Sequence, residues 1–348
     1  MFSYVAFTLT SVPGWAYETD QLTGRDVPLI DSLSTADEIM QGLLDRAVAA
    51  TNARTRCHTT PERTHEVLAR QIHRATARPR YVWARGVLRA PGFTVFSKAL
   101  ERSPADRLAF ADREDIFGDL SVWQSLILAV AGPCSTFEVD QIRTGSDKFD
   151  HFLGLGYTYW RLSRAGQDPD RAKRYGVATE RSFFGLLTSK TFSWADLRAN
   201  WDGYLFYQGL LSDDSTLTLD AGGCVARVAP FSWARWIDPG WDEVLNPPTF
   251  TRLVERGVIA HLEAHRDELC ASRARWDPVG LREAVIGSLE PGPEWVVGPT
   301  PGRRDPFQLG TLCAPSAPAL SPHPLRPRKE IRLQRRAQRG RGSGAPLP

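Results

Sequence analysis

Residues 147–159 read Asp-Lys-Phe-Asp-His-Phe-Leu-Gly-Leu-Gly-Tyr-Thr-Tyr, and this stretch decides the fold. Asp147 and His151 are four residues apart, so they share one face of a helix. The apolar side chains that continue beside this face are Phe152, Leu155 and Tyr159. A polar face next to an apolar one predicts a partly buried helix over about residues 147–165.

Two more helices are predicted directly after it, over about residues 169–187 and 194–211. The first of them includes Glu180. The second has Ser193 as its N-cap and Asp196 at its third position, which is a variant of the capping box. Asp196 and Asn200 are again four residues apart on one face. Three consecutive helices therefore each present acidic, amide or imidazole groups.

Glycines interrupt these helices at positions that call for an explanation. Gly154 and Gly156 each cost roughly 1 kcal/mol relative to alanine in a helix interior. Gly203 continues the face of Asp196 and Asn200. A glycine without a side chain lets another backbone or a ligand approach closely, so we expect close contacts at these positions.

The rest of the chain predicts a mainly α-helical protein with one small β-hairpin. Apolar side chains recur at helical spacing over about residues 37–52, 61–77, 120–131 and 249–275. Residues 215–230 instead alternate around Gly222-Gly223, which is typical of a hairpin. We expect one helical domain over about residues 15–300, which contains the Asp-Lys-x-x-His module at 147–211.

The two ends of the chain differ from this domain. Residues 1–14 have the apolar character of a signal peptide without its Lys/Arg region. They are either the remnant of a signal peptide or a first buried segment. Residues 301–348 are rich in Pro, Gly, Ser and Arg, with almost no regularly spaced apolar residue. Such a composition predicts a disordered tail.

The charge is divided unevenly along the chain. The net charge is +3, but residues 301–348 hold ten Arg or Lys against two acidic residues, a net charge of +8. Residues 1–300 therefore carry −5, so we expect no specific nucleic-acid binding by the folded body. The sequence also lacks an apolar run of 18 residues, so it predicts no transmembrane span.

Five cysteines leave two interpretations of the compartment open: Cys57, Cys134, Cys224, Cys270 and Cys313. None belongs to a Cys-x-x-Cys pair, which argues against a zinc knuckle or a thioredoxin-type site. Two long-range disulfides would indicate an oxidising compartment, whereas five buried thiols would not.

Six polar residues on the three consecutive helices form the candidate site: Asp147, Lys148, His151, Glu180, Asp196 and Asn200. In a catalytic interpretation the acid, base and carboxylate positions are His151, Asp147, Glu180 and Asp196, and the substrate is bound by Lys148 and Asn200. A metal-binding version uses His151, Glu180 and Asp196 as ligands of a divalent cation; no other cofactor is indicated. A binding or scaffold role, or a buried hydrogen-bond network that fixes the helices, needs no chemistry at all.

The order of these residues resembles a known group of proteins. Asp-Lys-x-x-His-Phe at 147–152, a later helical glutamate and Phe-Ser-x-x-Asp-Leu-x-x-Asn-x-x-Gly at 192–203 are similar to the VanZ-like teicoplanin-resistance proteins and the YfiM-like predicted periplasmic lipoproteins. The resemblance spans about residues 147–203. It implies a helical module at or outside the cytoplasmic membrane, with these polar residues as its shared core.

The chain departs from VanZ-like proteins in one respect that matters for location. Those proteins span the membrane several times, whereas the helices here contain Arg161, Arg164, Arg171 and Arg174 and are too polar to cross lipid. The soluble, exported relatives are the closer comparison. We therefore expect a periplasmic or secreted, envelope-associated protein that binds an envelope component or a small ligand. A hydrolase-type or metal-dependent enzyme that acts on an envelope substrate through His151 is the alternative.

Overall fold

The computed structural model describes residues 18–77, 94–110, 114–121, 123–125, 133–166, 169–181, 189–276, 307 and 309–314. Helices dominate these residues, and the strands in them form small two-stranded antiparallel sheets. The predicted mainly α fold class is therefore confirmed. Residues 1–14, the possible signal-peptide remnant, lie outside the described residues.

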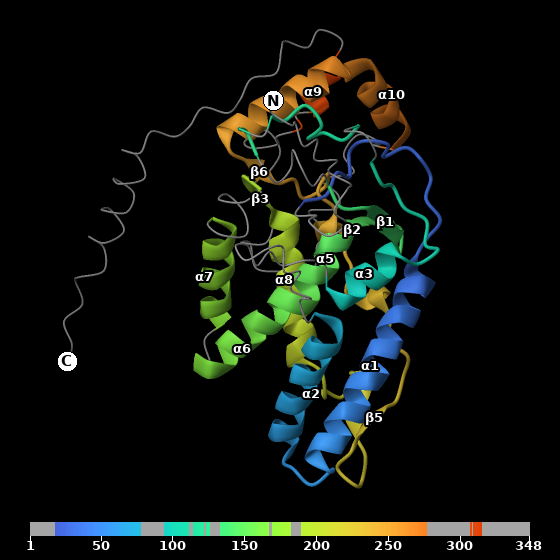
Figure 1. The fold of residues 1–348 in the computed structure, drawn as a ribbon, viewed down its shortest axis with the longest axis vertical. Helices are drawn as coiled ribbons and strands as arrows, with labels where there is room; N and C mark the ends of the chain where they lie inside the picture. Colours follow the sequence, from blue (N-terminus) through green and yellow to red (C-terminus); the bar gives the residue numbers. More distant parts are fainter. Residues whose placement is uncertain are drawn as a thin grey trace, which may run out of the picture.

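The first two helices form an antiparallel pair at one end of the molecule (Figure 1). Helix α1 (Leu33–Thr55) is longer than predicted. Helix α2 (Pro61–Thr76) begins as its sequence indicates, because the Thr60 side chain accepts a hydrogen bond from the backbone N–H of Arg63 and proline occupies the first helical position. The short helix α3 (Val95–Glu101) contacts both of them.

The predicted helix at 147–165 is interrupted by a π turn. Helix α5 (Ser146–Asp150) continues into the π turn η1 (His151–Leu155) and then into α6 (Gly156–Gly166). The π turn adds a residue to the helical turn that begins at His151, and such turns are frequent at functional sites. The next helices are α7 (Pro169–Glu180) and α8 (Trp194–Gln208).

Close backbone contact between α6 and α8 explains two of the three unusual glycines. A Cβ atom on Gly156 would lie 2.6 Å from the Cα of Gly203, and one on Gly203 would lie 2.1 Å from the carbonyl oxygen of Phe152. At Gly154 the nearest atom would be 3.9 Å away, so the expected close approach is absent there.

The predicted hairpin is confirmed, whereas two other strand pairs were not predicted. Strands β4 (Leu217–Leu219) and β5 (Val225–Arg227) pair in antiparallel register. The unpredicted pairs are β1 (Thr136–Val139) with β2 (Ile142–Gly145), and β3 (Thr191–Phe192) with β6 (Thr249–Phe250). The β3–β6 pair brings the start of α8 next to the start of α9.

The segment predicted as one helix over 249–275 is two helices, α9 (Arg252–Ala264) and α10 (Arg266–Trp276), separated at His265. The two single-turn 3-10 helices η2 (Trp233–Arg235) and η3 (Pro239–Trp241) precede them. The described residues of the segment 120–131 do not form the predicted helix. Residues 120, 121 and 123–125 form a turn, and the others lie outside the described residues.

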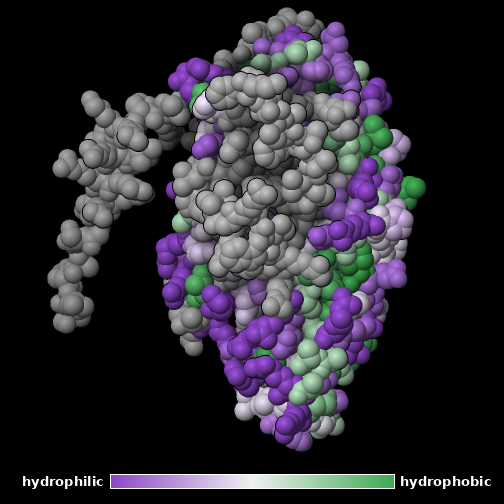
Figure 2. All heavy atoms as spheres, viewed as in Figure 1, coloured by the Kyte–Doolittle hydropathy of each residue, from purple (hydrophilic) through white to green (hydrophobic). Residues whose placement is uncertain are grey.

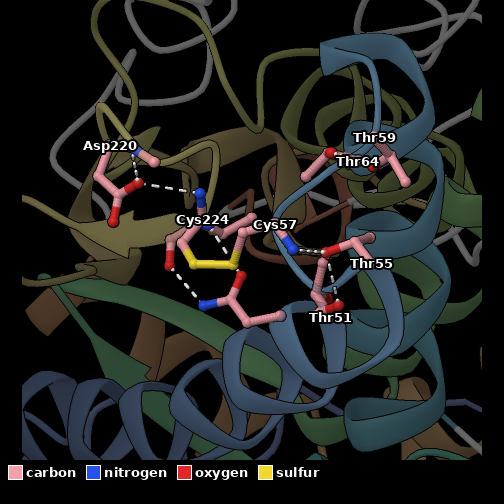
Figure 3. The surroundings of a disulfide bond; sticks show 10 residues. Thr51, Thr55, Cys57, Thr59, Thr64, Asp220 and Cys224 are labelled. Atoms are coloured by element: carbon pink, nitrogen blue, oxygen red, sulfur yellow. Dashed lines mark hydrogen bonds between the residues drawn. A yellow bond between two sulfur atoms is a disulfide. The ribbon is translucent and has the colours of Figure 1, made fainter.

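Two disulfides join segments that are far apart in the sequence. Cys57, just after α1, is bonded to Cys224 in the β4–β5 turn (Figure 3). Cys270 of α10 is bonded to Cys313, which follows the short helix α12 (Leu309–Leu312). The described part of the predicted tail, residues 307 and 309–314, is therefore packed against the body, and residues 301–306, 308 and 315–348 lie outside the described residues.

Aromatic side chains fill the main core between the helices. The largest fully buried ones include Trp233 and Trp241, which pack around Phe149 and Phe152 of α5 and η1. A second apolar cluster lies under α9 and includes Phe307 and Leu312. On the face seen in Figure 2, hydrophilic and hydrophobic residues are interspersed over the end formed by α1 and α2. Among the described residues, no helix combines the length and apolar character that crossing a bilayer requires.

Candidate functional site

Lys148 stands at the centre of the polar cluster, with none of its side chain exposed. Its Nζ atom lies 2.6 Å from Asp147 Oδ2 and 2.7 Å from both Asp196 Oδ1 and Glu243 Oε1. Burial by itself lowers the pKa of an ammonium group, but these carboxylates together raise the pKa of Lys148 well above its ordinary value. Lys148 is therefore charged, and it neutralises part of a strongly acidic interior.

Asp147 is held on its other side by the segment that precedes α1. Thr19 Oγ1 donates to Asp147 Oδ1 over 2.6 Å, and the free thiol of Cys134 lies 3.3 Å from the same oxygen. Burial opposes ionisation of Asp147, yet Lys148 and His151 lower its pKa below the ordinary value. Burial and the charge of Asp147 raise the pKa of the Cys134 thiol, which keeps it unreactive.

The start of α8 places Asp196 and connects it to Glu243. Ser193 Oγ accepts a hydrogen bond from the Asp196 backbone N–H (3.1 Å), which confirms the predicted cap. The same hydroxyl donates to Glu243 Oε1 over 3.0 Å. Burial raises the pKa of Glu243 to about 7, although Lys148 opposes this. The positive end of the α8 dipole stabilises the carboxylate of Asp196, which lies in the first turn of the helix.

His151 is the most exposed member of the cluster, with 15% of its side chain accessible, against at most 6% for its acidic and lysine neighbours in the ion pairs. Its Nε2 atom lies 3.2 Å from Asp196 Oδ2. Its Nδ1 atom lies 3.1 Å from Asn200 Oδ1. The π turn that begins at His151 directs the imidazole towards α8.

Two further glutamates lie in the cluster with one carboxylate oxygen each, Glu180 Oε1 and Glu18 Oε2, that has no hydrogen-bond partner among the described residues. Burial, with the charge of Asp196 as the next cause, raises the pKa of both well above the ordinary value. Glu180 accepts one backbone hydrogen bond from Ser193. Unpaired buried carboxyl oxygens are costly and are uncommon in a network that serves only structure.

The cluster contains two groups of ligand atoms with the spacing of a metal site. One atom from each of His151, Glu180 and Asp196 lies within 4.8 Å of the others, and so does one from each of Asp147, Asp196 and Glu243. In the second group the Lys148 ammonium already occupies the centre. The group with His151 remains the one that fits a divalent cation, since imidazole and carboxylate are ordinary metal ligands.

The structure brings together all six residues of the predicted site. The sequence did not identify four others that contact or face them: Glu18, Thr19, Cys134 and Glu243. Two polar loops, at 20–25 and 238–243, meet beside the cluster. There Arg25 pairs with Asp242 over 3.0 Å and Gln21 accepts from the backbone N–H of Glu243. The polar residues of the loop at 238–243 are the sequence feature that could have indicated Glu243.

Other candidate positions have structural partners. His261 of α9 is buried, and its Nδ1 atom lies 2.9 Å from Asp119 Oδ2. A cavity of about 300 Å³ is lined by residues of the α8 C-terminus, the following turn and η2, and its lining includes no residue of the polar cluster.

No protein-family model, curated protein or solved structure matches the chain.

Proposed function

We propose that the protein is an exported, envelope-associated helical protein that holds one divalent cation at His151, Glu180 and Asp196 in a binding role. The observation that carries this proposal is the buried carboxyl group of Glu180, which has one oxygen without a hydrogen-bond partner among the described residues and lies beside the ligand atoms of His151 and Asp196. A cation that bound there would give the Glu180 carboxyl group a partner.

The charge of the cluster supports a cation. Lys148 contributes one positive charge and already contacts three carboxylates. The same cluster contains two more carboxyl groups, those of Glu18 and Glu180. Their raised pKa values mean that, without added positive charge, these groups hold protons at pH values where carboxyls are normally ionised. A divalent cation replaces such protons readily.

The export part of the proposal is supported by the two disulfides, because such bonds persist in oxidising compartments. The resemblance of residues 147–203 to VanZ-like and YfiM-like proteins points the same way and stays a prediction. The partner in this proposal is an envelope component or a small ligand that reaches the cation from the side of His151, the most accessible residue of the ion-paired group.

Two measurements on the purified chain test the binding role. Elemental analysis after dialysis against a mixture of divalent metals should find about one equivalent in the native chain and none in His151→Ala. The melting temperature of metal-free His151→Ala should stay close to that of the metal-free native chain. A loss of several degrees with no bound metal in either protein would identify a structural network instead.

A metal-dependent hydrolase is the second candidate, and the number of ligands favours it. Three protein ligands leave at least one position of a four-coordinate ion open for water, as in catalytic metal sites. Hydrolysis of ester or phosphodiester test substrates that disappears in Glu180→Gln would establish it. Metal binding without any turnover would leave the binding role.

A further inference from the structure

The two nitrogens of His151 face different oxygen acceptors, the amide of Asn200 and the carboxylate of Asp196. Nδ1 faces Asn200 Oδ1 at 3.1 Å. A carbonyl oxygen can only accept, so Nδ1 is the donor of this hydrogen bond. Nε2 faces Asp196 Oδ2 at 3.2 Å. A carboxylate oxygen also only accepts, so in the metal-free chain Nε2 can donate to Asp196. A cation that binds at this position takes the place of the Nε2 proton, and the lone pair of Nε2 then faces Asp196 and Glu180.

Asn200 is itself held in this orientation. Its side chain is fully buried in α8, and its Nδ2 atom donates to the hydroxyl of Tyr159 over 3.1 Å. The amide has one donor end and one acceptor end, so a donor bond to Tyr159 leaves Oδ1 for His151. Tyr159 is fully buried in α6 and cannot turn away. The pair thus fixes the histidine through two hydrogen bonds in series.

This arrangement is the one found around metal-binding histidines, whose second ring nitrogen donates to an oxygen acceptor that fixes the tautomer. It also distinguishes between classes of cation. Mg²⁺ and Ca²⁺ take oxygen ligands, whereas imidazole suits Zn²⁺, Fe²⁺ and related first-row ions. A ring held with Nε2 towards two carboxylates therefore favours a cation of the second class.

We infer that the site takes a first-row transition-metal dication of the Zn²⁺ or Fe²⁺ class through His151 Nε2, and that Asn200 and Tyr159 are its positioning residues. This inference rests on the proposed function and deepens it. Neither positioning residue contacts the cation. They act by holding the lone pair of Nε2 at the position that Glu180 and Asp196 share.

Calorimetric titration of the metal-free full chain with Zn²⁺ and with Mg²⁺ tests the inference. Zn²⁺ should bind at least about 100-fold more tightly than Mg²⁺. Asn200→Leu should weaken Zn²⁺ binding by about 10- to 100-fold, whereas Asn200→Asp, which keeps an acceptor oxygen, should retain most of it. Asn52→Leu is the matched control, because Asn52 also makes two amide hydrogen bonds, to the backbone of Val225 far from the cluster. It should leave the Zn²⁺ affinity unchanged.

The outcomes separate this inference from the proposed function. If the native chain binds neither ion, the proposed function fails. If it binds both equally, the cation class is wrong. If Asn200→Leu and Asn52→Leu bind Zn²⁺ alike, Asn200 does not position the ring. Nitrogen NMR of the Zn²⁺-loaded native chain gives a readout that stability does not affect: the His151 proton should be on Nδ1, and a proton on Nε2 would overturn the assignment.

Discussion

Glu180 is the residue at which a metal site and a structural network make opposite predictions. Its carboxyl group is buried, and one of its oxygens has no hydrogen-bond partner among the described residues. Burial raises its pKa well above the ordinary value, which favours the neutral form when no cation is bound. Glu180→Gln keeps the shape of this neutral group. We expect the free energy of unfolding of the metal-free variant to lie within about 1 kcal/mol of that of the metal-free native chain, because a neutral amide replaces a neutral carboxyl.

The same variant should bind at least 10-fold less Zn²⁺ at a given concentration, since an amide is a poor metal ligand. Chemical denaturation and metal titration check the two halves of this prediction. A large loss of stability without any effect on metal binding would make Glu180 a structural residue.

Asp150, which precedes His151 in the chain, should make the stability of the fold depend on pH. Burial raises its pKa to about 7, although Thr94 and Ser97 donate hydrogen bonds to it. Between pH 4 and 7 the folded state therefore binds a proton that the unfolded state has released, so stability falls as the pH rises through this window. In Asp150→Asn this contribution, at most about 1.4 kcal/mol per pH unit, should disappear.

Denaturation curves of both proteins at several pH values measure the difference. Equal slopes of unfolding free energy against pH between 4 and 7 would contradict the raised pKa of Asp150.

Individual residues could be predicted where a helix provided the spacing. Asp147 with His151 and Asp196 with Asn200 follow from the four-residue repeat, and the structure joins both pairs in one cluster. Glu243 could not be predicted, because it follows the 3-10 turn η3 and meets Lys148 across 95 residues of chain. A loop has no period from which its inward-facing residues can be read.

At the scale of elements, the contact between α6 and α8 depends on two glycines. Gly156→Ala and Gly203→Ala would each drive a methyl group into backbone atoms, which cannot move aside as a flexible side chain can. We expect each to destabilise the fold by about 3 kcal/mol or more. Gly154→Ala is the control: its methyl has room, and alanine is the better helix former, so stability should stay equal or rise by up to about 1 kcal/mol.

These three variants are compared by thermal or chemical denaturation. A loss at Gly154 as large as that at Gly156 would show that the helices do not pack as described.

The helices were predictable and the short strands were not. Apolar periodicity located α1, α2 and α8 with ends that differ by a few residues. The predictions over 147–165 and 249–275 each joined elements that the structure separates. Strands β3 and β6 have two residues each, too few for any alternation, and their paired residues are 57 and 59 positions apart in the chain. The π turn at His151 leaves no signal in the sequence beyond the unusual glycines that follow it.

At the scale of the whole molecule, two disulfides join segments 167 and 43 residues apart and leave Cys134 free. The chain purified from an oxidising compartment should show one reactive thiol per molecule under denaturing conditions, and five after reduction. Reduction should cost about 2–5 kcal/mol per bond, because it releases the unfolded chain from closed loops. Five thiols before reduction would contradict the disulfides and remove a support for export.

The sequence left both interpretations of the cysteines open, since spacing alone does not reveal which sulfurs meet. It also placed the start of the tail before Cys313, whereas Phe307 and Leu312 are buried in the second apolar cluster. Composition alone does not show that a short apolar segment next to a disulfide packs against the body.

The proposed cation site is built from α5–η1, α7 and α8. Anomalous X-ray scattering from crystals of the full chain grown with Zn²⁺ tests this site most directly. We expect one strong peak about 2.0–2.2 Å from His151 Nε2 and from one oxygen each of Glu180 and Asp196. The absence of a peak there, with Zn²⁺ bound only at other positions, would contradict it.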